Sequence, residues 1–398
     1  MSIAGRSALH PDDGMTGSAD RMAHIQPFHV MALLARAREL EAAGRSIIHM
    51  EIGEPDFVTP QPVIDAGIAA LQQGHTHYTP AVGLTALRER IATYYRERYQ
   101  VMIEPGRIII TPGASAALQL VMAILVNPGD AVLMADPGYP CNRNFVHLLN
   151  GEPRGIPVDA ATGYQPTAEQ VQTDWDAQVA ALMLASPSNP TGTLLREQDI
   201  REIYEIVRQQ GGHLVVDEIY HGLTYAGAAQ TALAVSDDIF VINSFSKYFG
   251  MTGWRLGWLV TPETSVADLD KLAQNLFLAA PTPSQYAALA AFEPDNMTIL
   301  ESRREEFRTR RDYLLPALRE LGFGIPVTPE GAFYLYADCS RFTNDSYRFS
   351  QQLLEEAGVA ITPGIDFGSY RSGQHVRFAY TTSLEHLEEG VSRLKDFL

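Results

Sequence analysis

The chain has 398 residues, of which 46% are hydrophobic and 19% charged, which is typical of a globular protein large enough for two domains. Its formal net charge of −17 argues against nucleic acid or an anionic membrane as a general partner. Two cysteines, Cys141 and Cys339, are too few for a disulfide framework, and no cysteine or histidine spacing fits a metal site.

Residues 1–20 are polar and glycine-rich and lack the apolar core of a signal peptide, so we expect a disordered arm. The longest apolar run, around 118–126, is too short and too broken to span a bilayer. We therefore expect a cytoplasmic protein.

Helical spacing of apolar residues begins soon after this arm. Three helices are predicted in the first hundred residues: one that begins near Pro27 and stops at Gly44, and two over 62–73 and 84–99. A short strand is predicted over 46–50, followed by an irregular loop at Gly53-Glu54-Pro55-Asp56-Phe57. Tyr78 lies in a second loop, between two of the helices.

From residue 107 the pattern alternates between short apolar strands and helices. The predicted strands are 107–111, 131–134, 180–185, 213–216 and 239–243. Near-continuous apolar strands separated by helices predict an α/β fold with a mainly parallel sheet covered by helices on both faces. Ligands of such sheets bind at the carboxyl ends of the strands.

The last hundred residues differ, with fewer strands and longer helices. We predict helices over 302–321, 347–357 and 384–397, and strands over 331–337 and 376–380. This part, together with the N-terminal segment, predicts a smaller α+β domain. The expected divisions are a disordered arm at 1–20, an N-terminal segment packing with the small domain at 21–60, a large ligand-binding domain at 61–290, and the small domain at 291–398.

Polar motifs occur where the predicted strands end. Gly113-Ala114-Ser115 joins a strand to a helix, where free backbone N–H groups form an anion site. Such a turn is common, so the signal is weak alone. With Ser244 and Arg255, however, it offers the amide, hydroxyl and guanidinium donors that a phosphate monoester requires.

Two other strand ends present an amide and an acidic pair. Asn189 lies in the rigid turn 186–192, although an asparagine there can serve the turn alone. Asp217 and Glu218 end a buried strand, which is costly without a cationic partner. They can be helix N-caps, but a carboxylate beneath a pyridinium nitrogen explains the burial better, and Tyr220 can reach a neighbouring oxygen of the same ring.

Lys247 follows the strand 239–243 and lies among serines and aromatic residues. Its stem can simply cross an apolar surface. Alternatively, it is a desolvated amine with a lowered pKa that can form a Schiff base. Tyr139, at another strand end, is either a core residue or an aromatic that stacks on a planar ring.

These motifs together resemble the fold-type I pyridoxal-phosphate enzymes, specifically the class I/II aminotransferases, from about residue 27 to the C-terminus. The resemblance rests on Ser-Asn-Pro-Thr-Gly at 188–192, Asp-Glu-Ile-Tyr at 217–220, and Ser-Phe-Ser-Lys at 244–247 followed by Gly-Trp-Arg-Leu-Gly. Gly-Glu-Pro-Asp-Phe at 53–57 and Val-Arg-Phe at 376–378 strengthen it. The order and spacing of the motifs match the family.

The resemblance implies pyridoxal 5'-phosphate as cofactor, bound covalently to Lys247 as a Schiff base, with Lys247 then acting as general acid and base. Asp217 would keep the pyridine nitrogen protonated, and Asn189 and Tyr220 would bond the phenolic oxygen. Tyr139 would stack on the ring. The phosphate would be held by Ala114, Ser115, Ser244 and Arg255.

Family members are homodimers with shared active sites, and Tyr78 matches the tyrosine that reaches the neighbouring subunit's site. Arg377 matches the arginine that binds the substrate carboxylate, with Gly53 and Asn189 assisting. Cis peptide bonds are implied before Pro137 and Pro190.

We expect amino transfer from an L-amino acid to a 2-oxo acid such as 2-oxoglutarate or pyruvate, in ping-pong order. Ser115 stands where one dicarboxylate-specific subgroup has a lysine, and residues 25–31 are mostly apolar, which favours neutral, apolar or aromatic donors. Aspartate remains an alternative donor, because Arg143, four residues after Tyr139, could provide a cation for its second carboxylate. Further alternatives are a carbon–sulfur lyase or an aminocyclopropane-carboxylate synthase on the same scaffold. A transcription regulator built on this scaffold is disfavoured by the short N-terminal segment and the acidic charge.

Overall fold

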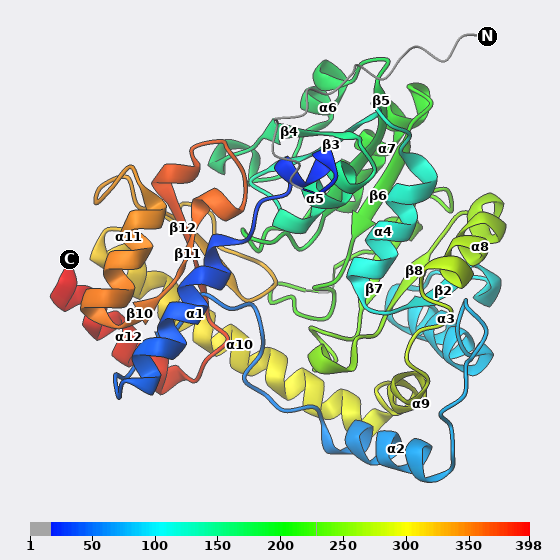
Figure 1. The fold of residues 1–398 in the computed structure, drawn as a ribbon, viewed down its shortest axis with the longest axis horizontal. Helices are drawn as coiled ribbons and strands as arrows, with labels where there is room; N and C mark the ends of the chain where they lie inside the picture. The colour runs from blue at the N-terminus through cyan, green and yellow to red at the C-terminus, as the bar shows by residue number, and fades with distance from the viewer. Residues whose placement is uncertain (1–16, 228) are drawn as a thin grey trace.

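The computed structural model describes residues 17–227 and 229–398. Of the predicted disordered arm, residues 1–16 lie outside the described part, and residues 17–20 are exposed. The rest of the chain builds a large sheet, a small sheet and a two-stranded ladder, with helices packed around them (Figure 1).

The large sheet has seven strands in the order β2-β8-β7-β6-β5-β3-β4. They are β2 (Ile108–Thr111), β3 (Ala131–Asp136), β4 (Glu152–Pro157), β5 (Val179–Ala185), β6 (His213–Asp217), β7 (Phe240–Ser244) and β8 (Gly257–Val260). Only β8 runs antiparallel to its neighbours, β2 and β7. The predicted α/β fold with a mainly parallel sheet is confirmed.

Helices cover both faces of this sheet. Within β5, Leu182 and Leu184 belong to one hydrophobic cluster, whereas Ala181 and Met183 belong to another. Because successive strand residues point to opposite faces, each face has its own core. The helices of this part are α2 (Gln61–Gln72), α3 (Thr85–Tyr99), α4 (Ala114–Leu125), α5 (Pro140–Leu148), α6 (Ala168–Asp174), α7 (Glu197–Gln209), α8 (Val266–Leu276) and α9 (Thr282–Ala290).

The sequence pattern does not predict β4 or β8. β4 contains Pro153, Gly155 and Pro157, residue types that are depleted in strands, and it is tolerated because it lies at the sheet edge beside β3 alone. β8 has only four residues and directly follows a glycine-rich motif, which favours a loop reading.

The N-terminal segment packs with the C-terminal part of the chain. The small antiparallel sheet has the order β11-β12-β9, and β1 pairs in parallel with β10. These strands are β1 (Ile48–His49), β9 (Tyr334–Asp338), β10 (Val359–Ala360), β11 (Thr362–Pro363) and β12 (His375–Ala379). The associated helices are α1 (His29–Ala42), α10 (Pro294–Leu321), α11 (Ser346–Gln352), a π-helical turn (Leu353–Ala357) and α12 (Leu384–Phe397). Figure 1 shows α1 beside this group, while the exact domain boundaries stay predictions.

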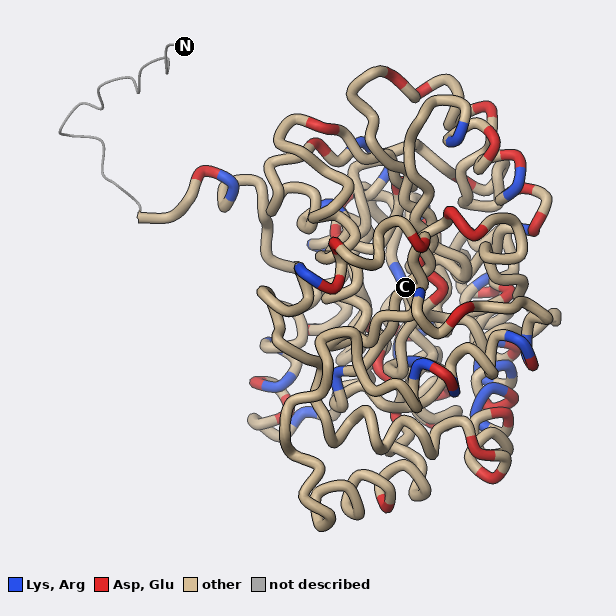
Figure 2. Tube along the Cα trace, turned by 90° about the vertical axis from the view of Figure 1, so that its right-hand side faces the viewer, with Lys and Arg blue, Asp and Glu red and all other residues tan. Residues whose placement is uncertain are grey.

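The long helix α10 begins at Pro294, earlier than the predicted start at residue 302. Proline is well placed at the first helical position, where its missing N–H costs no intrahelical bond, and Asp295 favours the first turn. Over the coloured part of the trace, acidic and basic positions lie close to one another, with longer uncharged stretches between them (Figure 2). No helix within 17–227 or 229–398 combines the length and hydropathy needed to cross a membrane.

Candidate active site

A cavity of about 400 Å³ lies at the carboxyl ends of the parallel strands, between the large sheet, the small sheet and α1. Its wall contains both polar and apolar residues. The predicted site residues that line it are Gly53, Ala114, Ser115, Tyr139, Asn189, Asp217, Tyr220, Lys247 and Arg377. The fold therefore brings together residues from seven separate stretches of the sequence.

Lys247 lies three residues beyond the end of β7 and is partly buried. Its Nζ donates a 2.6 Å hydrogen bond to the carbonyl oxygen of Gly53. Burial, followed by the nearby charge of Arg377, lowers the pKa of Lys247 to about 8. An amine with this pKa loses its proton near neutral pH and becomes a nucleophile or a base.

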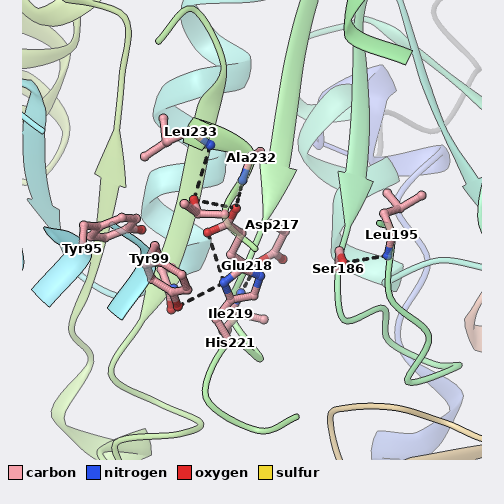
Figure 3. Close-up of polar contacts among 12 residues, drawn as sticks. Tyr95, Tyr99, Ser186, Leu195, Asp217, Glu218, Ile219, His221, Ala232 and Leu233 are labelled. Carbon is pink, nitrogen blue, oxygen red and sulfur yellow. Dashed lines mark hydrogen bonds and ion pairs between the residues drawn. The ribbon is translucent and has the colours of Figure 1, made fainter. Parts of the chain in front are cut away.

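Asp217 is the last residue of β6 and is only 5% exposed. Its Oδ1 accepts a 3.0 Å hydrogen bond from the amide of Ile219, as Figure 3 shows. Burial raises the pKa of Asp217 to about 6, although that amide and Lys247 oppose the shift. Among the described residues Asp217 forms no ion pair, so the carboxylate is free to meet a cation in the cavity.

Glu218 points away from the cavity into a buried cluster (Figure 3). Its Oε1 accepts hydrogen bonds from the amide of Ala232 and the hydroxyl of Thr231, at 2.7 and 3.0 Å. Its Oε2 lies 3.3 Å from Nδ1 of His221. Burial raises the pKa of Glu218 to about 8 and lowers the pKa of His221 to about 3. Burial thus favours the neutral form of both groups.

The N-terminus of α4 lies at the cavity, since Ala114 and Ser115 line it, and the free backbone N–H groups of a helix start can receive an anion. Gly113, the N-cap, has φ +81°, and a Cβ there would lie 2.6 Å from Nη2 of Arg255. Only glycine therefore fits between the helix end and the guanidinium. Ser244 lies nearby, and its hydroxyl donates to the carbonyl of Leu256 at 3.1 Å. Ser244 and Arg255 do not line the cavity itself but flank this helix end.

Arg377 projects from the middle of β12 and is 6% exposed. Its Nη1 donates to Oδ1 of Asn189 at 2.9 Å, and its Nη2 donates to the carbonyl of Glu51 at 2.6 Å. The guanidinium lies 4.1 Å from the ring centre of Tyr334 and 4.9 Å from that of Phe367. These contacts fix the plane of the guanidinium, which bidentate binding of a carboxylate requires.

Tyr334, Phe367 and Glu51 line the cavity but were not predicted as site residues. The hydroxyl of Tyr334 lies 2.7 Å from that of Tyr220. It also fills the space beside Gly53, since a Cβ there would lie 1.9 Å from it. The signal in the sequence is weak, because a tyrosine in an apolar strand is typical of a core.

Tyr78 is the predicted site residue that the fold leaves apart from the rest. Its side chain is 82% exposed, and it does not line the cavity of its own chain. The implied cis peptide bonds before Pro137 and Pro190 are confirmed, and a third precedes Pro187.

The cavity thus combines an amine of lowered pKa, a buried carboxylate and a helix N-terminus with free backbone N–H groups, a set of groups that suits an enzyme acting on anionic small molecules. The sequence profile of the family described as aminotransferase class I and II matches residues 45–394. The chain belongs to the class I and II aminotransferases, and its cofactor is pyridoxal 5'-phosphate.

Relatives and solved structures agree with this family. The chain is 39% identical to a (5-formylfuran-3-yl)methyl phosphate transaminase of Methanocaldococcus jannaschii, over 95% of this chain and 98% of that protein. It is 38% identical to a valine–pyruvate aminotransferase of Mycobacterium tuberculosis, over 96% and 99%. The structure of aspartate aminotransferase from Thermus thermophilus with maleate matches with a TM-score of 0.91, at 32% identity, over 96% and 100%.

Proposed function

We propose that this aminotransferase moves the α-amino group of a neutral, apolar or aromatic L-amino acid to a 2-oxo acid such as 2-oxoglutarate or pyruvate, in ping-pong order. The observation that carries this proposal is the apolar wall of the cavity. Its apolar members include Phe28, Val30, Met31, Leu34, Ile52, Leu118, Ile219 and Phe367. Such a wall favours an apolar side chain by the area that it removes from water.

In this proposal Lys247 holds the cofactor covalently, and Asp217 supplies the negative charge beneath the pyridine nitrogen. Tyr139 stacks on the ring, and Asn189 and Tyr220 bond its phenolic oxygen. At the N-terminus of α4, Ala114, Ser115, Ser244 and Arg255 would hold the phosphate. When bound, the cofactor supplies an electron-accepting ring for the carbon that loses its proton.

Arg377 binds the substrate carboxylate, with Asn189 and the backbone of Gly53 beside it. This contact places the substrate between the guanidinium and Lys247, since both cations line the same cavity. The amine of Lys247, free once the substrate's amino group has replaced it on the cofactor, would take the proton from Cα and give it back during the transfer. Its pKa of about 8 suits it to both directions of proton transfer near neutral pH.

We also propose a homodimer in which Tyr78 reaches the partner's site. Tyr78 is 82% exposed although it is large and aromatic. Its loop adjoins α9, since the hydroxyl of Thr282 donates to the carbonyl of His77 at 2.7 Å. Other exposed apolar residues on α2 and between α8 and α9 are Ile68, Leu71, Leu276 and Leu278. Exposed apolar groups of this kind favour burial against another subunit.

Aspartate is a second candidate donor. The residue that supports it is Arg38 and not, as expected from the sequence, Arg143. Arg143 does not line the main cavity, whereas Arg38 of α1 does. Arg38 makes no hydrogen bond or ion pair within the described residues, whereas Arg36 on the same helix pairs with Glu355 at 2.6 Å. A free guanidinium at the cavity wall can receive a distal carboxylate.

A donor panel separates these candidates. The cofactor-loaded enzyme is mixed with one amino acid at a time, without an acceptor, and the cofactor absorbance is followed. The proposal expects fast conversion by leucine, valine or phenylalanine and slow conversion by aspartate. Fast conversion by aspartate alone, lost in Arg38→Ala, would establish the second candidate instead.

A further inference from the structure

Two of the cations that line the cavity, Lys247 and Arg377, are held by carbonyl groups of one short segment. The carbonyl of Glu51 accepts from Nη2 of Arg377 at 2.6 Å. The carbonyl of Gly53 accepts from Nζ of Lys247 at 2.6 Å. Between them, the carbonyl of Ile52 accepts from the hydroxyl of Thr381 at 2.8 Å. The direction of these carbonyls therefore affects how both cations lie.

The side chain of Glu51 is fully buried beside this segment. Its Oε1 lies 2.7 Å from Nδ1 of His49, and Nε2 of the same ring lies 3.1 Å from Oε1 of Glu41 on α1. Glu51 raises the pKa of His49 to about 9, so the ring is charged at neutral pH and donates to both carboxylates. The row Glu41–His49–Glu51 thus runs from α1 to the cavity wall.

This row is not needed to pair the strands. β1 is held to β10 by backbone bonds, and the amide of Met50 donates to the carbonyl of Ala360 at 2.9 Å. Burying a carboxylate is costly, and Oε2 of Glu51 has no hydrogen-bond partner among the described residues. If position 51 had a structural role alone, an apolar residue would fill it without the free-energy cost of burying a carboxylate. The presence of Glu51 and His49 therefore indicates a role for this pair at the site.

We propose that Glu51 and His49 are positioning residues for Arg377. Their ion pair fixes the carbonyl of residue 51, which fixes the guanidinium plane that receives the substrate carboxylate. The hydroxyl of Thr362 supports the same carbonyl, since it donates to Glu51 O at 2.8 Å and accepts from Arg377 at 3.1 Å. The inference rests on the proposed role of Arg377 as the carboxylate-binding residue.

The test uses the cofactor-loaded enzyme with Glu51→Leu and His49→Leu, which break the pair, and Glu51→Gln, which keeps an acceptor for His49. Arg36→Gln is the matched control, because it removes an ion pair of α1 with Glu355 that does not line the cavity. Binding of 4-methylpentanoate, a carboxylate without an amino group, is measured by calorimetry. Steady-state kcat and KM for the best amino donor, and cofactor content, are measured in parallel.

We expect Glu51→Leu and His49→Leu to raise the Kd for 4-methylpentanoate and the donor KM about tenfold, or about 1.4 kcal/mol. Cofactor content and kcat should remain near those of the parent enzyme. Glu51→Gln should recover most of the affinity, and Arg36→Gln should not change it.

Unchanged Kd in both leucine variants, or loss of cofactor from folded variants, would overturn the inference. If Glu51→Leu fails to fold, an unchanged Kd in His49→Leu is enough to overturn the inference. Arg377→Ala separates the two proposals. If Arg377→Ala does not weaken the binding of 4-methylpentanoate, the role proposed for Arg377 is wrong. If Arg377→Ala weakens this binding but the two leucine variants do not, only the positioning role of Glu51 and His49 is wrong.

Discussion

Asn189 and Arg377 are joined by a 2.9 Å hydrogen bond, from Nη1 of the arginine to Oδ1 of the asparagine. The two residues come from the turn after β5 and from β12, and therefore connect the large sheet to the small one. Asn189 is also the residue proposed to contact the cofactor ring. One amide side chain thus links the proposed site of the cofactor ring to the proposed site of the substrate carboxylate, which fixes the distance between the two.

Arg377→Ala is expected to raise the donor KM about a hundredfold, because a charged, bidentate hydrogen-bonded contact contributes about 2–3 kcal/mol. Cofactor content should stay at the parent level, since Arg377 is assigned to the substrate. Initial rates and the absorbance of the purified protein check both points. A folded Arg377→Ala that loses its cofactor would show that the residue has been given the wrong role.

Lys247→Ala is expected to abolish covalent attachment of the cofactor and to lower kcat by at least about a thousandfold, because the residue is both nucleophile and base. Borohydride reduction followed by peptide mass mapping measures the attachment directly. Lys271→Ala is the control, since Lys271 is exposed and pairs with Asp268 on α8. Attachment that persists at another lysine in Lys247→Ala would contradict the assignment.

Gly113→Ala is expected to weaken cofactor binding, because the added Cβ would lie 2.6 Å from Nη2 of Arg255 and displace the guanidinium. Gly129→Ala is the matched control. Gly129 also has a positive φ, +93°, but a Cβ there meets nothing within 4 Å. Both variants carry the same kind of backbone strain, so the Kd for the cofactor should rise in Gly113→Ala alone. An equal rise in both would assign the effect to strain instead.

The Glu41–His49–Glu51 row gives a pH-dependent contribution to stability. The pKa of His49 is raised in the folded state to about 9, so the stabilisation is fully present below the unfolded pKa of about 6.5. It is lost as the pH rises through about 9. The difference in Tm between the parent enzyme and His49→Leu should therefore be largest at pH 6 and should shrink towards pH 10. A difference that is independent of pH would contradict an ionic role.

Site residues that belong to short contiguous motifs can be predicted from the sequence. Asp217 ends a buried strand, and Lys247 and Asn189 lie three and four residues beyond two others. Parallel strands carry such residues to one edge of the sheet. The mainly parallel sheet follows from the same alternation of apolar strands and helices.

Other features depend on contacts that no local pattern contains. Tyr334 meets Tyr220 across 114 positions, and Glu51 meets Arg377 across 326. Neither residue carries a signal of its own, since a tyrosine in a strand and an acid near a histidine are common. Tyr78 is the opposite case, a residue that its sequence motif assigns to the site. In the structure it is exposed and does not line the cavity of its own chain.

The central claim is amino transfer from an apolar donor, and a single-turnover reaction tests it most directly. The cofactor-loaded enzyme is mixed with leucine in the absence of any 2-oxo acid, and the products are identified after complete conversion. Amino transfer predicts one 4-methyl-2-oxopentanoate per site, no free ammonia, and an aminated cofactor that 2-oxoglutarate or pyruvate restores. Release of ammonia, or no conversion by any neutral amino acid while aspartate reacts, would contradict the account.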